Sequence, residues 1–599
     1  MNPRTPAADG LPRPKVIHST VGTRRSDVDF DVDPLESDAD RSVAQANLDL
    51  AMTIVRSLVN SGVRRAVVSP GSRSTPLALA LTGEASIVTD VVVDERAAAF
   101  VALGITRVTH RPVALLATSG SAGAHWLPAL AEASASRLPL IAITANRPAE
   151  LQRCGAPQTI DQAGMLAPFV VSTATFAALL PGQSLRPTQR ELLALCSALP
   201  RGPVHVDVAF RKPLWLAGLE PSVSKPIERI EESATAPRSA VDRLHAVSNQ
   251  RGVFVLGPND FAATDLQSLV NCACALGWPI LADIASGVRG IDSPAVVAHP
   301  EIAVRASSTV APEVVVAIGR WPTSRAVTNW LGDAPMILVD PHGDWHDPTH
   351  RAETLLAVPV GALFDAVRTR ATQSNTAWLE RWVALDAAAE AGLNTLVQRT
   401  PNNWSEAEVI REIHRALPAG THLHLASSMP IRDAEVFAGR QVGVTITSNR
   451  GANGIDGTIA TAAGIASTGR PTVVICGDVA ALHDVGGLVA ASELSRPLTV
   501  VILDNRGGNI FRKLPVKDHA RFRKLFLTPP ASDLRTLAGA VADRTTTAQS
   551  LAAARDAVTA SLRQPGLSVL VLSFDPDTNN RRRADLLAEV VAHTAASIQ

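Results

Sequence analysis

The stretch that most constrains the fold is residues 472–511, TVVICGDVAALHDVGGLVAASELSRPLTVVILDNRGGNIF. Two apolar runs, 472–476 and 498–503, flank a helical pattern at 485–494, which is typical of a parallel strand–helix–strand unit. Asp478 follows the first run and Asn505 follows the second. Because such a crossover brings both strand ends to one edge of a sheet, where open α/β folds bind ligands, we expect these two residues to lie together.

These residue types suit a hard metal ion. The Asp478 carboxylate, the Asn505 amide oxygen and the Gly507 carbonyl can supply part of an octahedral Mg²⁺ shell and leave places for water and phosphate oxygens. A diphosphate cofactor would therefore fit. Taken alone, the pattern is as typical of an ordinary strand–helix–strand unit with polar loop ends.

Length and composition narrow the class of protein. A chain of 599 residues is too long to fold around one hydrophobic core, and this length predicts three or four domains. Lys plus Arg and Asp plus Glu both total 56, so the net charge indicates neither nucleic acid nor an anionic membrane as partner. Five scattered cysteines without a CxxC pair favour a reducing cytoplasm, and no apolar run approaches the ~18 residues of a membrane span.

The chain divides into four segments. Residues 1–42 are acidic, lack apolar periodicity and are predicted to be a disordered extension. Residues 43–220 repeat a pattern of strand, loop and helix, which predicts a first α/β domain. Residues 236–373 show the same pattern but have no GxGxxG fingerprint. We therefore predict that this second segment is a Rossmann-like domain that holds no dinucleotide. A helical linker leads to a last domain at 400–595. The predicted class is α/β, with three doubly wound parallel-sheet domains.

One carboxylate stands out in the first domain. Glu95 follows a short strand pattern at 91–93 and precedes an apolar helix pattern. We expect its neighbours to desolvate it in part, which suits it to hold a hydrogen bond to a ring nitrogen. The alternative is a helix N-terminal acid that complements the helix dipole.

Eight motifs occur in an order typical of one enzyme family. They are SPGSRSTPL at 69, DERAAAFVALG at 94, TSGSA at 118, TANRPAEL with CGAPQTIDQ at 144–162, SSMPIRD at 427, SNRGANGIDG at 448, GDVAALHD at 477 and DNRGGNIF at 504. The chain resembles the 2-succinyl-5-enolpyruvyl-6-hydroxy-3-cyclohexene-1-carboxylate synthases, the MenD family of thiamine diphosphate enzymes. The motifs cover both outer domains and are jointly specific. The resemblance implies pyrimidine-binding, middle and diphosphate-binding domains, and a homodimer or homotetramer with each active site between two subunits.

The resemblance also implies an activity. With thiamine diphosphate and Mg²⁺ or Mn²⁺, such a transferase decarboxylates 2-oxoglutarate and adds the resulting carbanion to isochorismate in menaquinone biosynthesis. The alternatives are another thiamine diphosphate-dependent 2-oxoacid decarboxylase, an acetohydroxyacid synthase, or a non-catalytic binding protein of the same fold. The loops that carry arginine suit a dianionic donor and an anionic acceptor better than they suit pyruvate, and the joint presence of Glu95, Asp478 and Asn505 argues against a non-catalytic binder.

Site residues follow from the matched motifs. Glu95 matches the catalytic glutamate that hydrogen-bonds the aminopyrimidine N1′, and Ile455 matches the apolar wedge that bends the cofactor. Since both substrates are anions, the site needs fixed positive charge in a fork geometry. The implied cofactor-binding residues are Glu95, Gly477, Asp478, Asn505, Ile455, Ile510 and Phe511, with Asp478, Asn505 and Gly507 on the metal. The implied substrate residues are Ser72, Arg73, Arg147, Gln158, Ser428, Arg432, Arg450 and Arg325. Asn146 stands where many members have Asp, a departure that bears on substrate positioning.

Overall fold

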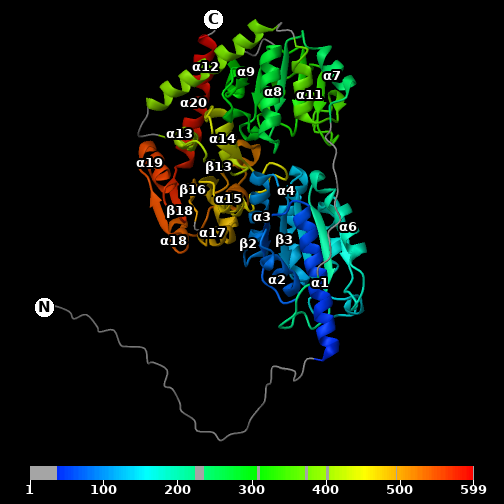
Figure 1. Ribbon diagram of the computed structural model, residues 1–599. Helices are drawn as coiled ribbons and strands as arrows, with labels where there is room; N and C mark the ends of the chain where they lie inside the picture. Colours follow the sequence, from blue (N-terminus) through cyan, green and yellow to red (C-terminus); the bar gives the residue numbers. More distant parts are fainter. Residues whose placement is uncertain are drawn as a thin grey trace, which may run out of the picture.

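The computed structural model describes residues 37–222, 235–306, 311–371, 375–399, 404–493 and 496–597. These residues form three α/β domains, each built on a six-stranded parallel sheet, as the sequence predicted. In Figure 1 the middle domain, in green, lies above the first domain, in blue and cyan, and the third domain, in yellow to red.

The first domain has the strand order β2-β1-β3-β4-β6-β5. Its strands are β1 (Arg65–Val68), β2 (Val88–Val91), β3 (Val113–Ala117), β4 (Leu140–Asn146), β5 (Ser172–Phe176) and β6 (Val204–Ala209). Its helices are α1 (Asp38–Asn60), α2 (Thr75–Gly83), α3 (Glu95–Thr109), α4 (Leu127–Ser136), α5 (Gln162–Leu166) and α6 (Arg186–Cys196).

The start of α1 corrects the predicted boundary of the disordered extension. The helix begins at Asp38, within the segment assigned to that extension. Ser37 and Asp40 form a capping box, in which each side chain accepts the backbone N–H of the other. This pairing satisfies helix donors that would otherwise lack partners, so a polar, acidic stretch becomes a helix start. The rest of the predicted extension, residues 1–36, lies outside the described residues.

The middle domain has the order β12-β11-β10-β7-β8-β9, which is the Rossmann arrangement. Its strands are β7 (Gly252–Leu256), β8 (Ile280–Ala282), β9 (Val296–Val297), β10 (Val314–Ile318), β11 (Met336–Val339) and β12 (Ala352–Leu356). Its helices are α7 (Arg238–His245), α8 (Ala263–Leu276), α9 (Pro300–Ala306), α10 (Arg325–Trp330) and α11 (Val360–Arg368). The linker to the third domain contains the long helix α12 (Thr376–Gln398).

The third domain has the order β14-β13-β15-β16-β18-β17. Its strands are β13 (His422–Leu425), β14 (Thr445–Thr447), β15 (Thr472–Gly477), β16 (Leu498–Asp504), β17 (Arg544–Thr547) and β18 (Leu567–Ser573). Its helices are α13 (Glu406–Ala416), α14 (Met429–Phe437), α15 (Thr458–Ser467), α16 (Asp478–His483), α17 (Val485–Ser492), α18 (Leu534–Gly539), α19 (Leu551–Ser561) and α20 (Pro576–Ala596).

The predicted strand–helix–strand unit is present in this domain. Strands β15 and β16 are parallel neighbours, with Cys476 opposite Ile502. The crossover holds two short helices, α16 and α17, where a single helix over 485–494 was expected. Helix α16 begins at Asp478 itself, so this carboxylate lies at a helix N-terminus as well as at a strand end.

One hydrophobic core joins the two outer domains, because helices α3 and α15 pack closely against each other. A Cβ atom on Gly104 of α3 would lie 2.1 Å from the Thr461 carbonyl oxygen, and one on Gly464 of α15 would lie 2.0 Å from the Val101 carbonyl oxygen. Glycine is therefore required at both positions, and the contact fixes the loops of one domain relative to the other.

Among the helices that the structure describes, none has the length and apolar character of a membrane span.

Candidate active site

The predicted site residues of the first domain lie in loops at the carboxyl edge of its sheet. The strand order reverses between the neighbouring strands β1 and β3, where doubly wound sheets form a ligand-binding crevice. Ser72 and Arg73 follow β1, Ser119 follows β3 and Arg147 follows β4. The Arg147 guanidinium donates to the Ser119 hydroxyl and, at 3.3 Å, to Oε1 of Gln158.

The third domain repeats this arrangement. Its order reverses between β13 and β15. Ser428 and Arg432 follow β13, Arg450 follows β14, and Asp478 and Asn505 follow β15 and β16. The fold thus brings these predicted residues into two groups, one at the carboxyl edge of the sheet of each outer domain.

Asp478 and the loop after β16 meet as expected. The Gly507 N–H donates to Asp478 Oδ2 at 2.6 Å, and the Val479 N–H donates to Oδ1 at 2.8 Å. Gly507 has a φ of +119°, and a Cβ atom there would lie 2.0 Å from the Leu527 carbonyl oxygen. Only glycine permits this turn, which keeps the loop against the carboxylate.

Asn505 is oriented by two residues that the sequence reasoning did not identify. Its Nδ2 donates to Glu406 Oε1 at 2.6 Å, and its Oδ1 accepts from Asn509 Nδ2 at 2.7 Å. Burial raises the pKa of Glu406 to about 8. No local pattern pointed to Glu406, which comes from the start of α13 in a distant part of the chain.

The donor set fits a hard divalent cation beside a diphosphate. Asp478 is only 2% exposed, and burial raises its pKa to about 6, with the Asp504 carboxylate adding to the effect. Burial thus disfavours the ionised form of Asp478, and a bound cation would offset this effect because it stabilises the ionised form of a nearby carboxylate. Carboxylate, amide and loop carbonyl oxygens are ligands that Mg²⁺ accepts.

Each outer domain also carries a pair of neighbouring arginines. In the first domain, burial lowers the pKa of Arg73, and the charge of Arg147 lowers it further. In the third domain, burial lowers the pKa of Arg432, and the charge of Arg450 acts in the same direction. Guanidinium groups stay protonated at physiological pH, so each pair is a partly buried double positive charge that an anion would stabilise.

Backbone contacts hold one guanidinium group of each pair in place. Arg73 Nη1 donates to the Phe210 carbonyl oxygen at 2.8 Å. Arg432 Nη1 donates to the carbonyl oxygens of Ser427 and Ser428, at 2.9 and 2.6 Å. The groups are therefore oriented before any ligand binds.

The Asn146 departure has a structural explanation in Asp207, a buried acid that the sequence reasoning missed. Asn146 Nδ2 donates to Asp207 Oδ2 at 2.7 Å, and Thr144 and Gln162 donate to Oδ1 at 2.6 and 2.8 Å. The Asn146 Oδ1 accepts the backbone N–H of Arg147 at 2.8 Å. An amide at position 146 thus connects the Asp207 carboxylate to the backbone of Arg147, which a second carboxylate could not do without a proton.

The remaining predicted cofactor residues lie near the domain contact or in the loop after β16. Glu95 is the half-buried first residue of α3, and Gly477 precedes α16 as its N-cap. Ile455 packs on the core that joins the outer domains. Ile510 is half-buried, and the exposed Phe511 ring lies edge-on to Phe526 at 5.7 Å.

Arg325 is not brought to either group. It is exposed at the start of α10 and lines a cavity of about 460 Å³ within the middle domain, together with Arg305 and Trp330. Its role in substrate binding stays a prediction. Arg320 of the same domain instead lies at the junction with the first domain, where it pairs with Asp260 at 3.4 Å.

Comparison with protein families defines the class. Residues 48–165 match the thiamine pyrophosphate enzyme N-terminal TPP binding domain, 215–425 match the middle domain of thiamine pyrophosphate enzymes, and 437–572 match the C-terminal TPP binding domain. The chain is a thiamine pyrophosphate enzyme, and the expected cofactor is confirmed at this level.

Individual relatives define the family. The chain is 36% identical over 583 residues to a protein of Myxococcus xanthus, covering 92% of this chain and 98% of the relative. It is 34% identical over 561 residues to a Listeria welshimeri protein, covering 89% and 96%, and 34% identical over 588 residues to a Geobacillus kaustophilus protein, covering 92% and 99%. All three are named 2-succinyl-5-enolpyruvyl-6-hydroxy-3-cyclohexene-1-carboxylate synthase. The chain belongs to this family of synthases, and the predicted resemblance is confirmed.

Proposed function

We propose that this chain catalyses the reaction of its family, the thiamine diphosphate-dependent decarboxylation of 2-oxoglutarate and transfer of the four-carbon unit to isochorismate in menaquinone biosynthesis. The observation that carries the proposal is the set of two partly buried arginine pairs, Arg73 with Arg147 and Arg432 with Arg450, at the carboxyl edges of the sheets of the two outer domains. Both substrates are carboxylates, and paired guanidinium forks bind carboxylates in a defined orientation.

Different residues of the chain would bind different parts of the cofactor. Asp478, Asn505 and the Gly507 carbonyl would hold Mg²⁺ or Mn²⁺ and, through it, the diphosphate. Glu95 would hold a hydrogen bond at the aminopyrimidine N1′, and Ile455 would support the bent form of the cofactor. When bound, thiamine diphosphate supplies the carbon nucleophile and the electron sink for decarboxylation.

The arginines and their neighbours bind and orient the substrates. Arg73 and Arg147, with Ser72 and Gln158, contribute from the first domain, and Arg432 and Arg450, with Ser428, contribute from the third. Because the guanidinium groups of Arg73 and Arg432 are already anchored to backbone carbonyls, these two lose little further freedom on binding. Such anchoring favours fixed carboxylate positions relative to the reacting carbon.

An active site shared between subunits is part of the proposal. Within the described part of one chain, no hydrogen bond or ion pair connects the two arginine pairs. Next to Glu95, the sheet-edge strand β2 and the following loop expose the apolar side chains of Val88, Val91 and Val93, each more than half accessible. A cluster of this kind is typical of a covered surface. A homodimer or homotetramer would cover it and bring Glu95 of one subunit to the metal-site residues of another.

The cytoplasm is the proposed compartment. All five cysteines are free thiols in the structure, and three of them, Cys196, Cys272 and Cys476, are buried. Burial raises the pKa of Cys272 to about 12, so this thiol is inert at physiological pH.

The experiment that tests the substrate class compares 2-oxo acids. CO₂ release is measured from 2-oxoglutarate and from pyruvate, each with thiamine diphosphate and Mg²⁺. We expect kcat/KM to favour 2-oxoglutarate by about 10²-fold or more, because pyruvate lacks the second carboxylate that a partly buried arginine would bind. A preference for pyruvate would instead support another 2-oxoacid decarboxylase or an acetohydroxyacid synthase.

A second measurement tests the non-catalytic alternative. Thiamine diphosphate with Mg²⁺ at 100 times its Kd should stabilise the folded protein by about 2.7 kcal/mol. Stabilisation without turnover of any 2-oxo acid would indicate a binding protein that keeps the fold.

A further inference from the structure

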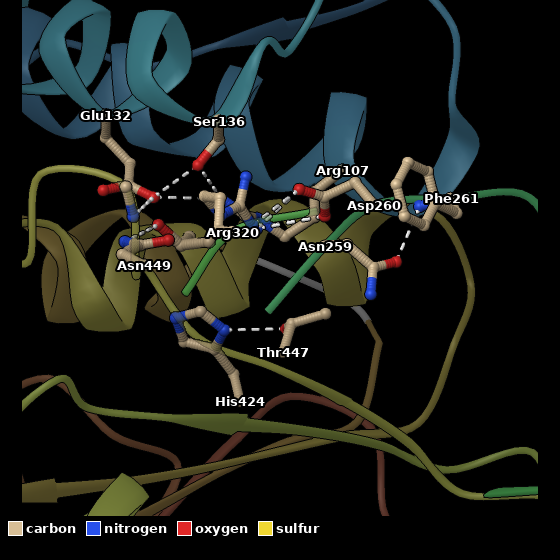
Figure 2. Close-up of polar contacts among 12 residues, drawn as sticks. Arg107, Glu132, Ser136, Asn259, Asp260, Phe261, Arg320, His424, Thr447 and Asn449 are labelled. Atoms are coloured by element: carbon tan, nitrogen blue, oxygen red, sulfur yellow. Dashed lines mark hydrogen bonds and ion pairs between the residues drawn. The ribbon is translucent and has the colours of Figure 1, made fainter. Parts of the chain in front are cut away.

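A buried charge cluster lies where the three domains meet (Figure 2). Arg107 of α3 pairs with Glu132 of α4 at 3.2 Å and with Asp260 of the middle domain at 3.0 Å. Arg320 approaches Asp260 at 3.4 Å, and the Ser136 hydroxyl donates to Glu132 at 2.9 Å. The Arg107 and Glu132 side chains are 2% and 3% exposed, so this pair is shielded from solvent.

Glu132 also bonds to a loop of the third domain. Its Oε1 accepts the backbone N–H of Gly451 at 3.0 Å, and its Oε2 accepts that of Ala452 at 2.7 Å. The loop backbone lies so close to α4 that a Cβ atom on Gly451 would be 2.7 Å from the Ser136 hydroxyl and 2.9 Å from the Ala135 Cβ. One carboxylate therefore fixes two consecutive peptide groups directly after Arg450.

The residues before Arg450 are fixed separately. The Thr447 hydroxyl is hydrogen-bonded to His422 Nε2 at 2.8 Å and to His424 Nδ1 at 2.9 Å. The Ser427 hydroxyl donates to the Asn449 carbonyl oxygen. Both histidines are buried, and burial lowers the pKa of His422 to about 3. The loop is thus held by neutral groups on one side of Arg450 and by an ionised group on the other.

We propose that Glu132 is a positioning residue for the substrate guanidinium of Arg450, acting through its paired hydrogen bonds to the Gly451 and Ala452 N–H groups. The inference rests on the proposed function, in which Arg450 binds a substrate carboxylate. Burial lowers the pKa of the half-buried Arg450, and the carboxylates of Asp283 and Glu132 oppose part of that shift. Arg107 holds Glu132 in place from the opposite side.

Glu132→Gln tests the proposal directly. Glutamine keeps the side-chain length but presents an NH₂ group to one of the two N–H donors. We expect KM for at least one of the two substrates to rise by about tenfold, or about 1.4 kcal/mol of binding. The thermal stabilisation by thiamine diphosphate with Mg²⁺ should be the same as in the parent protein, because Glu132 is not one of the residues proposed to bind the cofactor or the metal.

Asp340→Asn is the matched control. Asp340 is a buried carboxylate that also accepts two backbone N–H groups, from His342 and Asp344, and one arginine, Arg137, between the first and middle domains. Among the described residues, none of its hydrogen bonds goes to the Arg450 loop. We expect its substitution to lower the unfolding temperature but to leave both KM values within about twofold. An equal KM rise in this control would assign the effect to general loosening and overturn the proposal.

A second variant covers the case in which Glu132→Gln does not fold. Gly451→Ala leaves the Arg107 pair intact, but its Cβ must push the loop away from α4. The same KM rise is expected. Unchanged KM values for both substrates in Gly451→Ala would overturn the proposal.

A double-mutant cycle with Arg450→Ala separates this proposal from the proposed function. If Glu132 acts through Arg450, adding Glu132→Gln, or Gly451→Ala in its place, to Arg450→Ala should raise KM no further. If the KM increases of the two single variants instead multiply in the double variant, Glu132 does not act through Arg450 and the positioning role is wrong. If Arg450→Ala itself leaves both KM values unchanged, the substrate role of Arg450 fails, and the role proposed for Glu132 fails with it.

Discussion

Asn146→Asp is expected to destabilise the first domain in a strongly pH-dependent way. Asn146 and Asp207 are 7% and 4% exposed, and the amide donates to the carboxylate at 2.7 Å. The substitution puts two carboxylates at that separation. At an effective dielectric constant of 20, their repulsion would be about 6 kcal/mol, so the pair takes up a proton instead.

The cost of that proton sets the magnitude. Holding a carboxyl with an ordinary pKa near 3.9 in its protonated form costs about 1.4 kcal/mol per pH unit above that value. This gives about 4 kcal/mol at pH 7 and about 1.5 kcal/mol at pH 5, because the protonated carboxyl of the variant restores the hydrogen bond to Asp207. Because the pKa of the added carboxyl is higher in the folded variant than in its unfolded chain, the folded variant loses stability as the pH rises.

Thermal unfolding measured from pH 5 to pH 7 is the assay. At about 2–4 °C per kcal/mol, the first-domain transition should fall by roughly 8–16 °C at pH 7 and by roughly 3–6 °C at pH 5. Adding Asp207→Asn swaps donor and acceptor, and should recover most of the loss. A pH-independent loss, or no recovery in the double variant, would refute the reasoning.

Three other substitutions address the roles of single residues. Glu95→Gln should keep cofactor binding but slow exchange of the cofactor C2 proton by about 10²-fold or more, and near-normal exchange followed by NMR would remove Glu95 from this role. Asp478→Ala should abolish the Mg²⁺-dependent part of the thermal stabilisation by thiamine diphosphate, and a full Mg²⁺ response in this variant would place the metal elsewhere. Arg432→Ala should raise a substrate KM by about 10- to 100-fold with little change in cofactor affinity, and equal loss of both would indicate a disrupted site.

Local patterns were sufficient to predict the fold, and the candidate site residues came from the motifs that match the family. Alternation of apolar runs with helical segments predicted the parallel sheets, and the ends of β15 and β16 placed Asp478 beside the loop after Asn505. The start of α1 was missed, because its capping box is polar and resembles a disordered acidic stretch. Period and composition carry no information on such reciprocal side-chain bonds.

Contacts between domains could not be predicted in this way. Glu132 and Gly451 come from different domains, and neither stands in a pattern that indicates the other. Two contacts within single domains were also missed, because the partners lie far apart in the sequence: Glu406 of α13 orients Asn505, and Asp207 of β6 explains the amide at Asn146. These residues contact candidate site residues that the family motifs had indicated, and only the folded chain shows the contacts.

The most direct measurement follows both substrates in one reaction. Purified protein is incubated with thiamine diphosphate and Mg²⁺, and CO₂ release from 2-oxoglutarate and loss of isochorismate are recorded together. We predict that both require each cofactor and proceed in equal amounts, with a succinyl adduct of isochorismate as product. CO₂ release without consumption of isochorismate, or no release from 2-oxoglutarate, would contradict the proposed reaction.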